Sequence, residues 1–289
     1  MRKLVFAFMV GFLLPLYLIA QNTKGAVNTK AKTSTSAAPV GHAIEIVLKP
    51  YQNTKIYIGT NYGRNRVLAD SALLNEKSEG VFKSKTKLTP GIYFIVSPKY
   101  SILFDFLVDE AQHFKIIADT LSLNAFQIIG SKENDIFKAY SKSINDLGMQ
   151  LSSIENKYKT ATSAKDSASF KELYLAKDKE VKAARANVIN TNPGSMTSFF
   201  LNVMQRPEAP AMPTINGKLD SLYPYYYVKN HFWDDVVFND DRLLRTPFFE
   251  EKLDEYFKNY VSREPDSIIE EVQYMLTVAK TGKEIYPFL

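Results

Sequence analysis

The chain has 289 residues, 45% of them hydrophobic, and a formal net charge of +5. A charge this low on a chain of this length does not indicate a nucleic-acid-binding protein, in which lysine and arginine gather on one face. There is no cysteine, which excludes disulfides, thiolate nucleophiles, cysteine-ligated zinc and covalent haem attachment within the chain.

Residues 1–20 have the pattern of a secretory signal peptide. Arg2 and Lys3 give a positively charged start, residues 4–19 are apolar, and Ala20 is a small residue at the expected cleavage point. The apolar run is shorter than the ~20 residues of a membrane-spanning helix, which makes an uncleaved membrane anchor the less favoured alternative. We therefore expect a mature chain in the periplasm, with a charge of +3 (5 minus the 2 of Arg2 and Lys3) and no membrane segment. Without a cysteine at the cleavage point it is not expected to be a lipoprotein.

Residues 21–41 are rich in threonine, serine, alanine and lysine and contain few large apolar residues. Such a segment cannot bury enough apolar surface to offset the entropy that is lost on ordering. We expect it to be a flexible tether between the signal peptide and the first domain.

Residues 42–130 show the two-residue period of half-buried β-strands. Ile44, Ile46 and Leu48, for example, fall on one face of the first segment. Short segments of this kind follow one another with turn residues between them and no helical pattern, which predicts an antiparallel β-sandwich domain. The expected strands are 43–49, 55–59, 66–69, 80–84, 91–97, 102–108, 113–118 and 125–129.

From Gly130 onwards the period changes to about 3.6 residues, which predicts a mainly α-helical domain over residues 131–289. Ser131 is placed to cap a helix, and apolar residues recur every three or four positions from Ile136 to Tyr158. A second, highly charged helix is expected over 165–189, and the two helices should form an antiparallel hairpin. The predicted fold class is therefore α+β.

Further helices are predicted along the rest of the chain. Thr246 and Pro247 have the residue types of a helix cap and of a first helical position. Residues 283–289 read as a new apolar element without a partner, so we expect the helical domain to be truncated at its C-terminus. The expected elements are a helix over 196–204, an irregular connector over 206–217, a helix over 219–232, and helices beginning at Pro247 and Pro265.

Short motifs lie along the same stretch of chain. They are Gly130-Ser131 with Asn134, MQRPE at 204–208, YVKNH at 227–231, DRLLRTP at 241–247 and DSII at 266–269. Together with the exported leader and the order of the two domains, they resemble the N-terminal region of a family of Bacteroidetes envelope proteins. In that family a β domain and a helical domain, both of unknown function, precede a thioredoxin-like domain of the thiol–disulfide oxidoreductase type.

The resemblance implies a non-catalytic function for this chain. The family's redox centre is a Cys-x-x-Cys pair in the thioredoxin-like domain, and the sequence ends before any such domain. Thiol exchange needs a thiolate, so we expect this chain not to be an enzyme itself and to need no cofactor. The resemblance implies accessory domains that position the redox domain or a client protein, which would be its partners. The alternative is a stand-alone periplasmic module that binds a ligand or a protein.

Histidine and acidic residues offer candidate metal sites. His42, His113 and His231 are far apart in the sequence, and His231 lies near acidic residues. A histidine at the end of a helix more commonly interacts with the helix dipole than with a metal. The acidic residues lack the D-x-D-x-D-G spacing of a calcium loop and are as well explained by capping and by pairing with Arg242 or Arg245. They are Asp234, Asp235, Asp240 and Asp241, and no metal site is assigned.

Asp105, Asp109 and Glu110 form another acidic group, of the residue types that glycosidases use. Closeness in the sequence says nothing about the separation of the carboxyl groups in space, so we interpret the three as surface charge. Residues 59–63 (GTNYG) lack the lysine of a phosphate-binding loop, and no G-x-S-x-G or H-E-x-x-H motif occurs. No catalytic or cofactor-binding residue is therefore assigned.

An aromatic cluster is the remaining candidate site. Tyr225, Tyr226, Tyr227, His231 and Trp233 combine a large apolar area with polar groups, and they could line a groove for a peptide or a sugar. Their helical spacing is also typical of a core between the late helices, which is the favoured interpretation. The client or ligand and the oligomeric state do not follow from the sequence.

Overall fold

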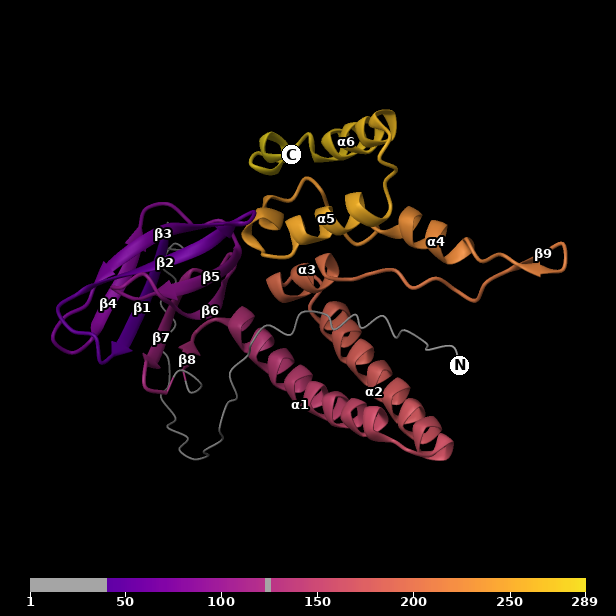
Figure 1. The fold of residues 1–289 in the computed structure, drawn as a ribbon. Helices are drawn as coiled ribbons and strands as arrows, with labels where there is room; N and C mark the ends of the chain where they lie inside the picture. Colours follow the sequence, from indigo (N-terminus) through magenta and orange to yellow (C-terminus); the bar gives the residue numbers. More distant parts are fainter. Residues whose placement is uncertain (1–40, 123–125) are drawn as a thin grey trace.

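The protein has a β region followed by a helical region, which confirms the predicted α+β class (Figure 1). The structure, a computed structural model, describes residues 41–122 and 126–289. The predicted signal peptide and all of the predicted tether except Gly41 lie outside these ranges. Among the described helices, none combines the length and the apolar composition that crossing a membrane requires.

The β region contains two four-stranded sheets, ordered β4-β1-β7-β8 and β3-β2-β5-β6. Neighbouring strands are antiparallel except β1 and β7, which are parallel with Ala43 opposite His113. The prediction of purely antiparallel pairing is wrong here, because no hairpin joins these two distant strands and fixes their direction. The first sheet contains β1 (His42–Lys49), β4 (Glu79–Ser84), β7 (His113–Asp119) and β8 (Gln127–Ile129), and the second contains β2 (Lys55–Tyr62), β3 (Asn65–Leu73), β5 (Gly91–Val96) and β6 (Ile102–Val108).

The two sheets share one apolar core. Ile44, Ile46 and Leu48 of β1 are buried in it, as the two-residue period predicts. Ile56 and Ile58 of β2 join the same core from the second sheet. Because burying a side chain of this size contributes roughly 1.5–3 kcal/mol, the core holds the sheets together.

A polar joint connects the second sheet to helix α1 (Lys132–Thr160). As predicted, Ser131 caps α1, and its hydroxyl oxygen accepts a hydrogen bond from Asn134 N at 3.3 Å. The Asn134 side chain then pairs with the backbone of Leu107 on β6. Its Oδ1 accepts from Leu107 N and its Nδ2 donates to Leu107 O, both at 2.8 Å. One asparagine side chain thus covers part of an edge strand that would otherwise need a neighbouring strand.

Glu133, in the same turn, ties α1 to helix α3 (Met196–Val203). Its carboxylate is 3% exposed and accepts from Met196 N at 3.0 Å, Thr197 N at 2.7 Å and Thr197 Oγ1 at 2.6 Å. The first N–H groups of a helix lack partners within the helix and lie at its positive end, so an anion is favourable there. The motif around Asn134 is therefore explained by the packing of β6, α1 and α3.

Replacing Asn134 by aspartate is expected to destabilise the protein more than replacing it by alanine. Aspartate keeps the acceptor for Leu107 N but cannot donate to Leu107 O, and it places a carboxylate against that carbonyl. We expect a loss of about 1–3 kcal/mol for N134A and roughly 1 kcal/mol more for N134D. Urea unfolding followed by circular dichroism measures both. Equal stabilities would mean that the Leu107 carbonyl does not need this donor.

Helices α1 and α2 (Ala164–Thr191) form the predicted hairpin, here called the two-helix arm. It projects from the body of the protein in Figure 1. No residue of α2 is fully buried, because the two helices pack mainly against each other. The apolar seam of α1 is half-buried as predicted, and consists of Ile136, Tyr140, Ile144, Leu147, Leu151, Ile154 and Tyr158.

The later helices surround a second apolar core that also includes residues of the second sheet. Ile92 of β5 and Leu107 of β6 belong to it together with Phe200, Leu244 and Phe249. The β region and the helical region are therefore packed directly against each other. Besides α3, the elements are α4 (Tyr223–His231), the 3-10 helix η2 (Asp241–Arg245), α5 (Phe249–Asn259), α6 (Pro265–Ala279) and α7 (Ile285–Phe288).

The predicted helix start at Pro247 is wrong. Helix α5 begins at Phe249 and has no side-chain cap. The Thr246 hydroxyl donates instead to Leu243 O at 2.9 Å, where it closes the end of η2. Threonine and proline thus mark an element boundary here, but their capping contact belongs to the preceding element. The predicted start of α6 at Pro265 is confirmed.

The last residues of the sequence pack against the rest of the chain, contrary to the prediction that they lack a partner. Ile285 of α7 is fully buried, and the rings of Phe288 and Tyr62 meet edge to face with centroids 5.7 Å apart. Asp241 Oδ1 accepts from Glu284 N at 2.9 Å and from Ile285 N at 3.0 Å. These partners come from distant parts of the chain, which a local pattern does not reveal.

A second projection, here called the hairpin arm, comprises residues 205–222. Its tip is a small sheet of β9 (Thr214–Ile215) and β10 (Lys218–Leu219). The first strand lies in the predicted irregular connector, and the second overlaps the start of the helix predicted over 219–232, which begins only at Tyr223. Asn216 and Gly217 have φ angles of 51° and 77°, as a two-residue Asn-Gly hairpin turn requires. In Figure 1 the tip lies beyond α4, far from the β region.

Candidate functional site

The aromatic cluster singled out in the sequence lies on and just after α4, and it is partly surface and partly core. Tyr225 and Tyr226 are exposed, with ring centroids 5.2 Å apart. Tyr227 and His231 are half-buried, with ring centroids 4.3 Å apart. Trp233 is 8% exposed and belongs to the helical core. The three tyrosines and His231 therefore remain candidates for contact with a partner. Trp233 instead packs in the helical core.

A buried lysine that was not among the predicted site residues lies among the aromatic rings of this core. Lys252 of α5 is 1% exposed. Its Nζ lies 5.1 Å from the ring centroid of Phe232 and 5.6 Å from that of Trp233, and it donates a hydrogen bond to Gln205 O at 2.8 Å. A signal was available in the sequence, because Lys252 stands three residues after Phe249 on the helical period of buried positions.

The pKa of Lys252 is lowered to about 7, mainly by burial and also by the neighbouring Arg206 guanidinium, while the charges of Asp235 and Glu255 act in the opposite direction. Arg206 is itself paired with Glu255, through Nε at 2.7 Å and Nη2 at 2.6 Å. A lysine with a pKa near neutrality can act as a base or a nucleophile where a substrate reaches it. At 1% exposure Lys252 is not reachable, so we interpret this cluster as core.

The acidic residues after α4 make structural contacts. Among the described residues, no group of three or more histidine or acidic side chains could hold a metal ion. His231 Nδ1 lies 2.7 Å from Asp234 Oδ2. Asp240 pairs with Arg242 as predicted, its carboxylate accepting from Nε at 3.0 Å and from Nη2 at 2.6 Å. Asp241 holds α7 in place, as described above.

The other two histidines lie in the β region. His42 is almost completely buried, with Nε2 2.8 Å from Asp70 Oδ2 and Nδ1 2.8 Å from Thr86 O. A carbonyl and a carboxylate both accept hydrogen bonds, so this pair connects β1, β3 and the segment after β4 rather than offering a free ligand. His113 lies at the start of β7, as predicted, and its side chain is exposed.

The three carboxylates on and after β6 have different surroundings. Glu110 is exposed and pairs with Lys87 at 2.6 Å, which agrees with the interpretation as surface charge. Asp109 accepts from the backbone N–H two residues further on at 3.0 Å. Asp105 is half-buried on the outer face of the second sheet, where burial raises its pKa and the charge of Arg66 lowers it.

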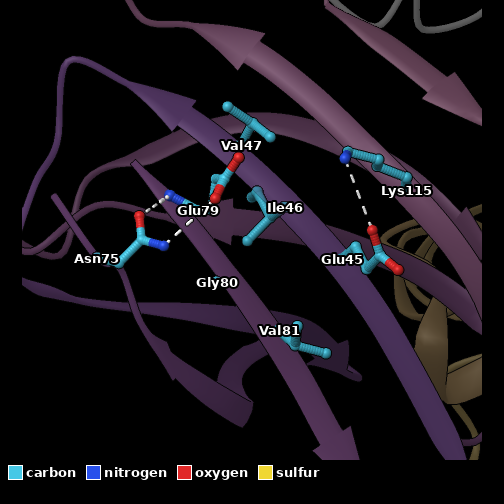
Figure 2. Close-up of a pocket in the computed structure, with 8 residues that line it drawn as sticks. All are labelled: Glu45, Ile46, Val47, Asn75, Glu79, Gly80, Val81 and Lys115. Carbon is cyan, nitrogen blue, oxygen red and sulfur yellow. Dashed lines mark hydrogen bonds and ion pairs between the residues drawn. The ribbon is translucent and has the colours of Figure 1, made fainter. Parts of the chain in front are cut away.

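A hollow of about 340 Å³ lies on the first sheet, and Figure 2 shows the residues that line it. Lys115 Nζ lies 3.6 Å from Glu45 Oε2 on one side of it, and Asn75 Nδ2 donates to Glu79 Oε2 at 3.3 Å on the other. The polar groups therefore satisfy one another and do not converge on a common point in Figure 2. We assign no ligand to this hollow.

A second depression of about 370 Å³, here called the second-sheet hollow, lies on the second sheet. Its lining is mainly apolar. Phe94 and Val96 of β5 are buried, whereas Leu68 of β3 and Tyr100 of the β5–β6 turn are exposed. The lining residues are Arg66, Val67, Leu68, Phe94, Val96, Tyr100 and Ile102.

Both arms also expose apolar side chains. Ile215 and Leu219 at the tip of the hairpin arm are 55% and 63% exposed, and Leu173 on the two-helix arm is 49% exposed. The arms are joined near the base of the hairpin arm, where Lys182 of α2 pairs with Glu208 at 2.5 Å. The protein thus presents two connected projections with apolar residues on their surfaces.

Comparison with protein families assigns part of the helical region. Residues 174–289 match the family model of a domain of unknown function, DUF5106. This part of the chain is a DUF5106 domain. It runs from within α2 to the end of α7, and so contains the hairpin arm, α4 and Lys252. No curated protein and no solved structure shows a significant match to the chain.

The DUF5106 domain depends on residues outside the matched range for part of its packing. Its helix α2 pairs with α1, and the N-terminus of α3 receives the Glu133 carboxylate. Ile92 and Leu107 of the second sheet belong to its apolar core. The domain and the β region are therefore one packed unit, in which the arms and the second-sheet hollow hold defined positions.

Proposed function

We propose that this chain is a non-catalytic, protein-binding part of the cell envelope. In this proposal it positions a client protein or a redox domain for thiol–disulfide exchange that a cysteine-bearing, thioredoxin-family domain carries out. The lack of cysteine in the sequence supports the non-catalytic role, because the exchange needs a thiolate. The signal-peptide pattern of residues 1–20 supports a periplasmic location, and the motif resemblance supports the link to thiol–disulfide oxidoreductases. The shared core of the two sheets supports a β-sandwich as the first domain.

The observation that carries the proposal is the exposure of apolar residues on both arms. Single exposed apolar residues are common on soluble proteins, but here they occupy projecting elements that have little core of their own. A two-stranded hairpin is only marginally stable alone, so a partner that covers Ile215 and Leu219 would stabilise the tip as well as bind to it. Apolar segments of a client chain would meet this requirement.

Charged substitutions at the tip of the hairpin arm test the proposal. The double variant Ile215→Asp and Leu219→Asp is expected to bind reduced, carboxymethylated α-lactalbumin, a permanently unfolded probe, at least about tenfold more weakly than the wild type. Because both side chains are exposed, the fold should be retained. Fluorescence anisotropy of the labelled probe measures the affinity.

The control is Leu121→Asp, which places one of these two negative charges on a residue that is 85% exposed in the β region. It should bind the probe like the wild type. An arm variant with unchanged affinity would refute the assignment of the arm as the binding surface. A wild-type chain that does not bind the probe would refute the client-binding function.

The alternative, a stand-alone ligand-binding module, is favoured by the second-sheet hollow. Its volume of about 370 Å³ lies within the range of small-ligand sites, which are concave and mostly apolar with a few polar groups. A bound small molecule in purified material, seen by native mass spectrometry and lost in a Leu68→Asp variant, would favour this alternative.

A further inference from the structure

A histidine and an aspartate meet between the two sheets of the β region. His42 stands two residues before Ile44 on β1, so its side chain lies on the core face of the first sheet, where it is 3% exposed. Asp70 stands two residues before Ala72 of β3, which belongs to the same core. Because His42 Nε2 lies 2.8 Å from Asp70 Oδ2, this pair connects the first sheet to the second.

An extra residue in β3 directs Asp70 toward the core. Leu68 and Asp70 lie opposite consecutive residues of β2, so Ala69 between them is the extra residue of a β-bulge. On a regular strand, Leu68 and Asp70 would share one face. Instead, Leu68 is 52% exposed at the second-sheet hollow, whereas Asp70 reaches the buried ring of His42. Bulges commonly re-aim a side chain in this way, and here the bulge brings a carboxylate between the sheets.

Both ring nitrogens of His42 face hydrogen-bond acceptors. Nδ1 lies 2.8 Å from Thr86 O, and a carbonyl oxygen cannot donate, so Nδ1 carries a hydrogen. Nε2 faces the Asp70 carboxyl group, whose other oxygen accepts from Ser71 N at 2.7 Å. A hydrogen bond from a backbone N–H favours the ionised carboxylate, so Nε2 carries a hydrogen as well. The geometry therefore calls for a doubly protonated, positively charged ring.

The ring has one charged neighbour. Among the described residues, Asp70 is the only charged side chain within ion-pair distance of His42. On the adjacent strands, Lys83 of β4 and His113 of β7 are exposed on the outer face of the first sheet. Lys85, in the segment after β4, is also exposed. A buried positive charge needs a paired negative charge, and Asp70 supplies it from the other sheet.

Loss of one proton to the solvent would leave the ring with one donor for two acceptors. The charge of Asp70 retains the hydrogen on Nε2, so the bare Nδ1 would face Thr86 O, and two acceptors repel each other. The segment after β4 would then move away from the ring. It stays anchored at Leu88, whose N–H and C=O both pair with the Gln112 side chain at 2.7 Å. The change is therefore confined to residues 85–87.

The chain enters β1 directly against this segment. Gly41, the residue before β1, has a φ angle of 94°, in the left-handed region that glycine enters without strain. A Cβ at Gly41 would lie 2.1 Å from Ser84 O and 2.7 Å from the carbonyl carbon of Lys85. Release of residues 85–87 therefore loosens the point at which the chain enters the β region.

We infer that His42, Asp70 and Thr86 form a conformational device that one proton keeps closed, here called the His42 clasp. The doubly protonated ring holds residues 85–87 against the end of β1, and loss of one proton at higher pH releases them. The clasp goes beyond the proposed function, because neither arm takes part in it.

Nuclear magnetic resonance of the ¹³C,¹⁵N-labelled mature chain (residues 21–289) tests the protonation state directly. At pH 7.5, both ring nitrogens of His42 should give the signals of protonated nitrogen, and the Asp70 side chain that of a carboxylate. The exposed ring of His113 provides the comparison with a histidine in water. A His42 ring with one bare nitrogen at this pH, or a protonated Asp70, would overturn the inference.

Trypsin measures the release of the segment, because it cleaves after lysine and Lys85 is exposed. Dividing the rate of cleavage after Lys85 by the rate after Lys218, an exposed lysine of the hairpin arm, removes the effect of pH on trypsin itself. Between pH 7 and 9.5 this ratio should rise at least about tenfold, since the segment loses a hydrogen bond to a charged group. A constant ratio, or a His42 ring that keeps both protons up to pH 9.5, would contradict the clasp.

Asp70→Asn is the matched variant that should abolish the dependence on pH. Asparagine can accept from Ser71 N through Oδ1 and donate through Nδ2 to His42 Nε2, so a neutral ring keeps its hydrogen bond to Thr86 O. D70N should therefore fold, show one bare nitrogen on His42 at pH 7.5, and change the cleavage ratio less than about twofold between pH 7 and 9.5. If the ratio in D70N rises as in the wild type, another group controls the segment and the inference is wrong.

Discussion

Replacing Lys252 by methionine is expected to raise the free energy of unfolding at pH 7 by about 1–3 kcal/mol, the usual gain when a buried charge gives way to an apolar group of similar shape. Methionine retains the packing of the side-chain stem against Phe232 and Trp233. It removes one donor to Gln205 O, but that oxygen still accepts from Arg206 Nη1 at 3.0 Å. The substitution therefore leaves no unpaired acceptor at this position.

The lowered pKa of Lys252 makes the unfolding free energy of the wild type depend on pH. The pKa of Lys252 is about 7 in the folded chain and about 10.4 when unfolded. Between these values the unfolded state binds more protons, so the wild type gains stability as the pH rises, by up to about 1.4 kcal/mol per pH unit. The stability that the wild type gains in this way is fully present above the unfolded pKa and is lost as the pH falls through about 7.

Urea unfolding at pH 7, 8 and 9 measures this effect as the difference between wild type and K252M. The unfolding free energy of K252M minus that of the wild type should fall by about 2–3 kcal/mol over that range, because the wild-type lysine becomes neutral. Lys258→Met is the matched control, since Lys258 is an exposed lysine on the same helix. A constant difference between wild type and K252M would contradict the lowered pKa.

The elements that the sequence predicted well are those that local spacing determines. The two-residue period around Ile44 and the apolar seam from Ile136 to Tyr158 both depend on which face of one element is buried, and both are confirmed. The parallel pairing of β1 with β7 and the partners of Ile285 depend on residues far away in the chain. No local pattern contains that information.

The candidate surfaces show the same contrast between features that local sequence reveals and features that depend on distant residues. The tyrosines of α4 were identified from the sequence with a core as the favoured interpretation, whereas Tyr225 and Tyr226 lie at the surface. The second-sheet hollow depends on the absence of a side chain at Gly59 and on the φ angle of Tyr100. Neither becomes visible until β2, β5 and the turn after β5 are assembled.

Lys252 was missed for a different reason. Lysine is almost never fully buried unless it is paired. It is therefore normally left out when the buried face of a helix is predicted from the sequence. Here the backbone oxygen of Gln205 and the faces of two aromatic rings replace a carboxylate partner. The cost of this arrangement is the lowered pKa, which links this position to the first prediction.

Replacing Glu133 by alanine is expected to destabilise the protein by about 2–4 kcal/mol, because it leaves buried donors unpaired. Met196 N and Thr197 N both donate to this carboxylate, at the positive end of α3. Glutamine would offer one acceptor oxygen but turn an amide N–H toward a donor, so E133Q should lie between alanine and the wild type. The order of the three proteins therefore follows from the number of acceptors at one helix end.

Denaturation with urea gives the three free energies, and Asp135→Ala serves as the control. Asp135 lies in the same first turn of α1 but is exposed, so its loss should cost less than about 0.5 kcal/mol. An E133A variant that is as stable as D135A would contradict the role of Glu133 as the tie between α1 and α3. Because α3 contributes Phe200 to the core that also contains Ile92 and Leu107, loosening this tie should also weaken the packing of the helical region on the second sheet.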